Sequence, residues 1–401
     1  MPDDTLGRFK RWFWRPPRPH GETIADRSVS SLELFYDLVY VVVIAQAAHH
    51  LAEDASARGF AEFVVVFALI WIAWINGSLY YEIHGREDGR TRAFVFVQMG
   101  ILVLLAVFTA DAAQGTGPAF ALIYAAFLAV MTWLWYTVRR QDREQRPEFL
   151  PVTARYVTGM VASVVAIFAS AFLADGPRLV LWAIFALAWL VGILLVERSP
   201  IGLYRGLTPT DSLVERFGLF TIIVLGEVVF GVVTGLSAAE HDLKTIATGM
   251  IALGIGFGFW WIYFDVVGRR LPRDDGPALA NWVLSHLPVT LSIAVGGAAM
   301  VSLIEHAHDA STPATTAWLL AGAVALGLIA EAIIARSLVD AERLADAYRP
   351  VSRALVVGAA AALVIGWLQP APWLLALLLV VILSALWLFA VDRFLRAGAW
   401  A

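Results

Sequence analysis

Acidic side chains lie inside the long apolar stretches of this sequence, where a purely anchoring segment would carry only apolar residues. Glu33 and Asp37 stand in the stretch 32–51, and Glu227 stands in the middle of the run 224–231. An acid at the centre of a bilayer costs about 2.5–3.5 kcal/mol even on lenient scales, so such groups usually face a partner, a cavity or a pathway. These acids are therefore candidates to bind a cation or to relay protons.

Glu33 and Asp37 are four residues apart, which places them one helical turn apart on one face. Glu33 lies near the start of its stretch and could simply cap the helix, because acids are favoured there by the helix dipole. Asp37 lies about one turn deeper, so its need for a partner is greater.

Glu227 is the deepest acid in the chain, and it is flanked by Gly226 and Gly231. Glycines at these positions would let another helix backbone approach closely. A carboxyl in this place suits a carrier of protons or cations. The structural alternative is a protonated glutamic acid that holds two spans together.

Glu215 and Arg216 mark the start of another apolar stretch. An ion pair between Arg216 and one of the acids Asp37, Glu33 or Asp265 would satisfy both partners. The alternative is a packing or gating salt bridge with no part in transport.

Two histidines are further candidates. His286 precedes Pro288, which would free a backbone carbonyl, and a broken helix beside a polar residue often forms a site. His49 shares a face with Gln46 at the end of the first stretch, where a histidine could sense pH, shuttle protons or only hydrogen-bond at the interface.

Asn76 and Glu82, in the second apolar stretch, are secondary candidates. Asn76 could hydrogen-bond between helices, and Glu82 ends the segment Tyr80-Tyr81-Glu82. Glu62 and Glu331 also lie within apolar stretches, in no recognisable pattern.

Glu305, His306 and His308 form a polar cluster with Asp309. Histidines and acids can bind a divalent metal ion, but residues two apart do not share a helix face. We expect a solvated loop and leave metal binding open, with no cofactor predicted.

The elements that must position these residues are membrane-spanning helices. The chain has 401 residues, of which 60% are hydrophobic and 15% charged, whereas a soluble domain carries about 25% charged residues. It contains no cysteine. Spans need about 20 apolar residues, and the sequence predicts an all-α transmembrane bundle of about twelve spans: 32–52, 60–80, 92–111, 118–138, 152–174, 178–196, 213–236, 245–267, 282–304, 316–338, 353–369 and 372–391.

Loop charge supports this count independently. Alternate loops and both tails carry nearly all of the 29 lysines and arginines, whereas the intervening loops hold only Arg58, Arg178 and Lys244. The positive-inside rule then predicts that both termini are cytoplasmic.

The predicted organisation has two halves. The boundaries are a basic and aromatic cytoplasmic tail at 1–31, a first transmembrane half at 32–198, a cytoplasmic linker at 199–212, a second transmembrane half at 213–392 and a short cytoplasmic tail at 393–401. Matches between the first and seventh spans, and between the second and eighth, suggest two parallel six-helix repeats.

Three motifs carry a resemblance to a known family. They are the segment LELFYDLVYV at 32–41, the segment ERFGLFTIIVLGE at 215–227, and the segment WWIYFD at 260–265. In these motifs the chain resembles the bacterial low temperature requirement A family. The resemblance implies a multi-pass protein of the bacterial inner membrane, and it implies architecture rather than activity.

The sequence leaves several functions open. No nucleotide-binding loop, zinc-protease motif or nucleophile elbow occurs, so an enzyme is the less favoured class, and nothing supports nucleic-acid binding. The first hypothesis is an ion- or proton-coupled secondary transporter of unknown substrate. The alternatives are a cation channel, an intramembrane enzyme and a non-transporting sensor or scaffold. The expected partners are the lipid bilayer and protons or small cations, and the oligomeric state is left open.

Overall fold

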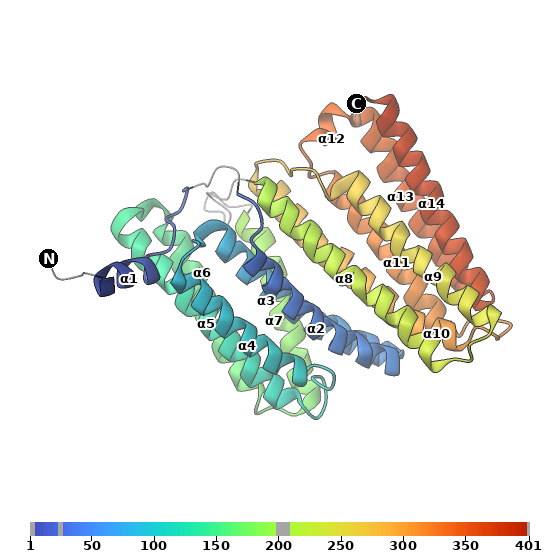
Figure 1. Cartoon of the computed structure of the whole chain (residues 1–401), viewed down its shortest axis with the longest axis horizontal. Coiled ribbons are helices and arrows are strands. Elements are labelled where there is room, and N and C mark those ends of the chain that lie inside the picture. The colour runs from blue at the N-terminus through green and yellow to red at the C-terminus, as the bar shows by residue number, and fades with distance from the viewer. Residues whose placement is uncertain (1–4, 23–26, 198–208, 399–401) are drawn as a thin grey trace. The chain divides into compact units, whose positions relative to one another are not determined.

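The structure, a computed structural model, is all-helical over the residues it describes, which are 5–22, 27–197 and 209–398 (Figure 1). No strand occurs in these ranges. Twelve helices are long and apolar enough to cross a membrane. The predicted all-α bundle of twelve spans is therefore confirmed.

The helices correspond one to one with the predicted spans. They are α2 (Ser31–Glu53), α3 (Ala57–His84), α4 (Gly89–Val107), α5 (Gly117–Gln145), α6 (Leu150–Ser170), α7 (Asp175–Glu197), α8 (Asp211–Ala238), α9 (Leu243–Ile262), α10 (Gly276–Glu305), α11 (Ala314–Ala335), α13 (Ala345–Leu368) and α14 (Pro372–Arg396). Short elements accompany them: α1 (Thr5–Phe13), a 3₁₀ turn η1 (Pro147–Phe149), a π-helical turn η2 (Tyr263–Val267) and α12 (Asp340–Arg343).

Polar caps set several helix starts. The side chains of Asp88, Asp242 and Asp275 accept hydrogen bonds from backbone N–H groups in the first turns of α4, α9 and α10, and Thr210 does the same for α8. Such caps satisfy donors that the helix itself leaves unpaired. They lie outside the apolar runs, which is why these four helices begin before the predicted spans.

The chain divides into two compact units. Unit 1 comprises 1–46 and 65–208, and unit 2 comprises 47–64 and 209–401. The segment 47–64, which joins α2 to α3, thus groups with the second unit, whereas the predicted halves placed it in the first. Residues 199–208 of the predicted linker lie outside the described part of the chain. The six-helix repeat stays a prediction.

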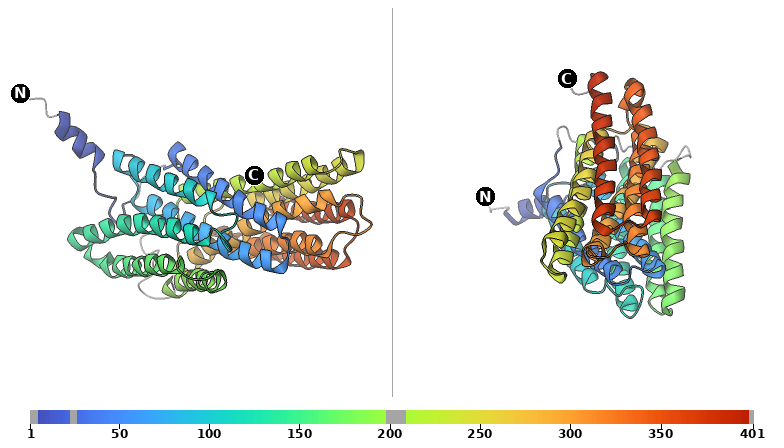
Figure 2. Two further views of the ribbon diagram at one scale, coloured as in Figure 1. Left: turned by 90° about the horizontal axis from the view of Figure 1, so that it is seen from below. Right: turned by 90° about the vertical axis from the view of Figure 1, so that its right-hand side faces the viewer.

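In unit 2, α10 is the central helix. It packs against α8 on one side and α11 on another, α11 packs against α13, and α14 packs against both α13 and α9 (Figure 2). In the most apolar stretch of α10, 78% is buried. One end of this unit carries Arg269, Arg270, Arg273, Arg336 and Arg343 and is called the arginine-rich end below.

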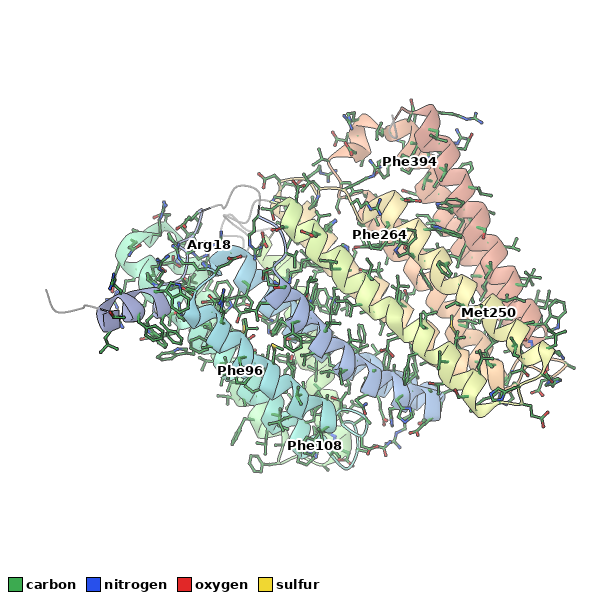
Figure 3. The ribbon with its side chains drawn as sticks, viewed as in Figure 1. Arg18, Phe96, Phe108, Met250, Phe264 and Phe394 are labelled. Carbon is green, nitrogen blue, oxygen red and sulfur yellow. The ribbon has the colours of Figure 1, made fainter. Side chains whose placement is uncertain are left out.

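Large apolar side chains cover the outside of both units. Phe96 of α4 is 75% exposed and Met250 of α9 is 57% exposed (Figure 3). Apolar surface of this extent on long helices is compatible with lipid and not with water. The chain is a multi-pass integral membrane protein.

Candidate functional site in the second unit

Glu227 lies in the middle of α8 and is only 4% exposed. Within the described part of the chain, its carboxyl group has no hydrogen-bond or ion-pair partner. A carboxylate without a partner in an apolar place is unstable as an anion. The group therefore needs a proton or a cation.

The backbones of α8 and α10 are in contact beside Glu227. A Cβ atom on Gly231 would overlap the carbonyl oxygen of Gly297, and a Cβ on Gly297 would lie 2.6 Å from the carbonyl oxygen of Glu227. The close approach expected at Gly231 is thus confirmed. Around Gly226 there is open space, so the same expectation was wrong there.

The Glu227 side chain lines a cavity of about 340 Å³. His49, Glu53 and Glu305 line it as well, and no lysine or arginine does. The rest of the wall is small or apolar: Ala48, Ala52, Phe230, Gly231, Thr234, Gly297, Ala298 and Val301. Three carboxyl groups around one low-dielectric cavity create a potential that attracts cations.

The polar groups that line this cavity differ in exposure. His49 Nε2 lies 3.3 Å from Glu53 Oε1, and these side chains are 51% and 67% exposed. Glu227, by contrast, is buried. The cavity thus joins an exposed His–Glu pair and a buried carboxyl group.

A second polar cavity lies at the arginine-rich end of the same unit. It has a volume of about 630 Å³ and is lined by Asp211, Asp265, Asp340, Arg269 and Arg270, among others. Arg270 pairs with Asp340 at 3.2 Å. The predicted site residue Asp265 accepts a hydrogen bond of 2.7 Å from the indole of Trp387.

His286 occupies the buried region next to the π-helical turn. Its Nδ1 lies 2.7 Å from the Trp282 carbonyl oxygen, and its Nε2 lies 3.0 Å from the Tyr263 hydroxyl. A carbonyl can only accept, so Nδ1 carries the proton, and in the neutral ring Nε2 accepts from Tyr263. The ring centroids of Phe217 and Trp282 lie 4.7 and 4.5 Å from the centroid of the His286 ring.

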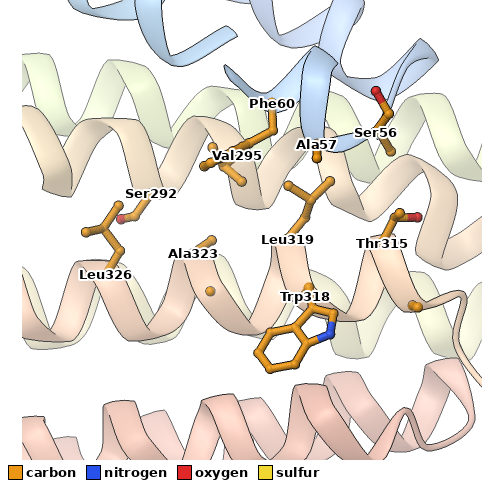
Figure 4. Close-up of a pocket in the computed structure, with 13 residues that line it drawn as sticks. Ser56, Ala57, Phe60, Ser292, Val295, Thr315, Trp318, Leu319, Ala323 and Leu326 are labelled. Carbon is orange, nitrogen blue, oxygen red and sulfur yellow. The ribbon is translucent and has the colours of Figure 1, made fainter. Parts of the chain in front are cut away.

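A third cavity in unit 2, of about 470 Å³, differs in chemistry. Leu319 and Ala323 of α11 face Val295 of α10 and Phe60 of α3 across it (Figure 4). No titratable side chain lines this space. It therefore offers nothing for the binding of protons or cations.

Arg216 and Glu215 behave differently although they are neighbours. Arg216 is fully buried and Glu215 is exposed. Both residues have interaction partners. Because Arg216 belongs to unit 2 and both Asp37 and Glu33 belong to unit 1, the ion pair proposed between Arg216 and these acids stays a prediction.

In unit 1, Arg27 joins two of the predicted acids. Its guanidinium lies 2.6 Å from Glu33 Oε1 and also pairs with the carboxylate of Glu82. Glu33 Oε2 accepts from the backbone N–H of Ser30 at 3.0 Å, so the predicted cap is present. The signal that sequence reasoning missed is Arg27, which lies in the basic tail.

Asp37 is fully buried, and the indole N–H of Trp74 donates to its Oδ1 at 2.9 Å. Asn76 is buried too, with its Nδ2 donating to the Ile72 carbonyl at 2.7 Å and its Oδ1 accepting from the hydroxyl of Tyr156. Asn76 therefore joins α3 to α6, as expected of a residue that hydrogen-bonds between helices. Gln46 is half-buried.

The residues considered for a metal ion do not gather. His308 pairs with Asp242 at 2.5 Å, His306 Nδ1 bonds the Ser302 carbonyl oxygen at 2.8 Å, and Glu305 lines the cavity of Glu227. Over the ranges that the structure covers, no group of three or more His, Asp and Glu side chains is placed to hold a metal ion.

The N-terminal segment contributes buried residues that the sequence did not single out. His20 is 3% exposed, and its Nδ1 lies 2.9 Å from Asp142 Oδ1. Arg18 is 2% exposed, and burial lowers its pKa to about 10. The partners lie more than a hundred residues apart in sequence, so no local pattern could indicate the pairing.

Comparison with known proteins identifies a bacterial family that this chain matches. The family model described as bacterial low temperature requirement A protein matches residues 28–389. The match includes α2 to α13 and most of α14.

One similar protein is an uncharacterized protein of Rhizobium meliloti (strain 1021). The two are 26% identical over 289 residues, which is 67% of this chain and 68% of the relative. No solved structure matches this chain.

Proposed function

This chain belongs to the bacterial low temperature requirement A family, and on that premise we propose that it is a secondary transporter coupled to protons or small cations. We further propose that it lies in the bacterial inner membrane with both termini in the cytoplasm. The second point follows from the distribution of arginine among the loops.

The observation that carries the proposal is the state of Glu227. A buried carboxyl group without a protein partner faces a cavity of about 340 Å³ that contains two further glutamates and no basic residue other than His49. A structural carboxyl would have a donor or a cation provided by the protein. Binding of a proton or a cation supplies the missing partner.

Access from two sides is the second requirement of a transporter. The cavity of Glu227 and the cavity of Asp265 are both in unit 2, and the arginine-rich end holds the latter. The packed core around His286 and Tyr263 is buried. We expect a conformational change to expose Glu227 alternately to the two sides of the membrane. Binding of a proton or a cation would neutralise the carboxylate, and the neutral site could then move past the apolar core.

The test is flux in sealed liposomes that contain the purified protein and a trapped pH-sensitive dye. A membrane potential imposed across the liposomes should drive a flux of protons or cations, and this flux should saturate as the ion concentration rises. The variant Glu227→Gln should lower this flux at least about tenfold, which corresponds to about 1.4 kcal/mol. The matched control is Glu240→Gln, because Glu240 is an exposed acid near the end of the same helix and does not line the cavity.

Two results would reject the proposal. Normal flux in Glu227→Gln would show that this carboxyl group carries nothing. Single-channel currents without saturation would point to a channel instead.

A further inference from the structure

Glu331 is a second buried acid in unit 2, on α11, and it is not among the residues of either polar cavity. It is 1% exposed, and its Oε2 has no hydrogen-bond partner among the described residues. No ion pair that the structure describes involves it. It therefore meets the condition of an acid buried without a counterion.

The packing one turn away fixes which side chains Glu331 faces. A Cβ on Gly327 would lie 2.6 Å from a ring carbon of Phe259 on α9 and 2.8 Å from the Ser292 hydroxyl on α10. Glu331 follows Gly327 by four residues, on the same face of α11. Tyr263 follows Phe259 by four residues in the same way.

The direction of the three helices brings these positions to one level. Helices α9 and α11 run parallel to each other, because α10 reverses the chain between them. One turn beyond Gly327 and Phe259 therefore leads to Glu331 and Tyr263 together, where α11 also packs against the π-helical turn.

The environment of Glu331 decides its form. A carboxylate that is buried without a hydrogen-bond donor or a counterion is unstable as an anion, whereas the protonated acid carries no charge. The Tyr263 hydroxyl does not supply the missing donor, because it donates its only proton to His286 Nε2.

The other titratable groups around α11 do not change this balance. Tyr348 on α13 donates to the Val266 carbonyl at 3.2 Å. Asp346, Arg349 and Arg353, the charged residues of α13, are exposed. His286 is the titratable side chain of α10 in this region.

We propose that Glu331 is a second proton-binding site, held as a neutral carboxylic acid beside the Tyr263–His286 pair. A role for this protonation in transport rests on the proposed function, whereas the protonation itself does not.

The test uses infrared spectra of the purified full chain in lipid, with glutamate labelled by ¹³C at the side-chain carboxyl, at about pH 8, far above the ordinary glutamate pKa. The wild type should show a carboxylic acid C=O band that shifts with the label and in D₂O. Glu331→Gln should remove that band, and Glu342→Gln, an exposed acid on α12, should leave it. In Glu227→Gln the Glu331 band should persist, which separates this site from the transport site.

A second variant keeps the test open if Glu331→Gln does not fold. Glu331→Asp keeps a carboxyl group but carries no label, so the labelled acid band should disappear while the protein keeps an acid at this position. The proposal is overturned if the wild type shows no carboxylic acid band that Glu331→Gln removes. It is also overturned if Glu331→Gln removes only a carboxylate band, or if the labelled acid band survives in Glu331→Asp.

Discussion

The backbone of Gly231 on α8 touches the backbone of Gly297 on α10, and this contact forms a wall of the cavity that Glu227 lines. A side chain at Gly231 would overlap the Gly297 carbonyl oxygen. Small residues are used in this way where membrane helices pack closely. The position of Glu227 relative to α10 therefore depends on glycine at both contact positions.

The variant Gly231→Ala should destabilise the protein by about 1–3 kcal/mol, because an extra methyl group forces two packed backbones apart. Thermal unfolding in detergent would measure the loss. Gly226→Ala is the control in the same helix: nothing lies within 4 Å of a Cβ there, and alanine is favoured over glycine in a helix by about 1 kcal/mol. Equal melting temperatures for the two variants would contradict this account.

Arg27 is expected to be worth more than an ordinary surface arginine. It serves Glu33 and Glu82 at once, and the latter is 5% exposed. Removing one partner of a buried ion pair leaves an uncompensated charge and costs about 3 kcal/mol. Arg27→Ala should therefore lower the melting temperature clearly in the same unfolding assay.

Arg86→Ala provides the comparison for Arg27. Arg86 pairs with Glu22 at 3.1 Å, but both side chains are about a third exposed, and such pairs contribute less than about 1 kcal/mol. If Arg86→Ala were as destabilising as Arg27→Ala, the pairing of Arg27 with Glu33 and Glu82 would contribute no more stability than an exposed ion pair.

Protonation of Asp242 should lower the stability of the folded protein in acid. Its side chain accepts from the backbone N–H of Thr245 at 2.8 Å and pairs with His308 at 2.5 Å. The backbone hydrogen bond is the main reason that the Asp242 pKa is lowered. Since the folded pKa is below the unfolded one, the charged form stabilises the fold above about pH 4, and this contribution is lost as the pH falls through the folded pKa.

The measurement for Asp242 is melting temperature against pH. Asp242→Asn keeps an oxygen that can cap α9 but cannot bind a proton, so wild type should melt higher at neutral pH and the two curves should converge in acid. Asp309→Asn, at an exposed aspartate of the next loop on that side, should follow the wild type throughout. A constant gap between Asp242→Asn and wild type would show that charge is irrelevant at this cap.

Much of this architecture could be predicted from the sequence because the bilayer imposes a simple rule. Runs of about 20 apolar residues must be helices, and all twelve were identified. The same rule made Glu227 conspicuous, since a single acid in the run 224–231 has no local partner. The spans can be predicted from hydropathy and loop charge without knowing which helices pack against one another.

The site itself depends on contacts that no local pattern encodes. Tyr263 became important through a π-helical turn, which has no sequence signature of its own, and through His286, 23 residues away. In the sequence, Glu331 is an acid in no recognisable pattern. Its surroundings are set by Gly327, where α11 packs against Phe259 and Ser292.

The last prediction concerns the charge on Glu227 and needs no substrate. If the buried carboxyl faces its cavity without a partner, Glu227→Gln should melt higher than wild type in choline chloride at alkaline pH, because the neutral amide avoids a buried charge. Protons or added Na⁺ or K⁺ should raise the wild-type melting temperature toward that of the variant, by an amount equivalent to about 2.7 kcal/mol at a hundredfold excess over Kd. Glu227→Gln should respond little, and Glu240→Gln should respond like the wild type. A wild-type protein that melts above Glu227→Gln under these conditions, with the same response to salt, would mean that the carboxylate is already balanced by the protein and awaits no ion.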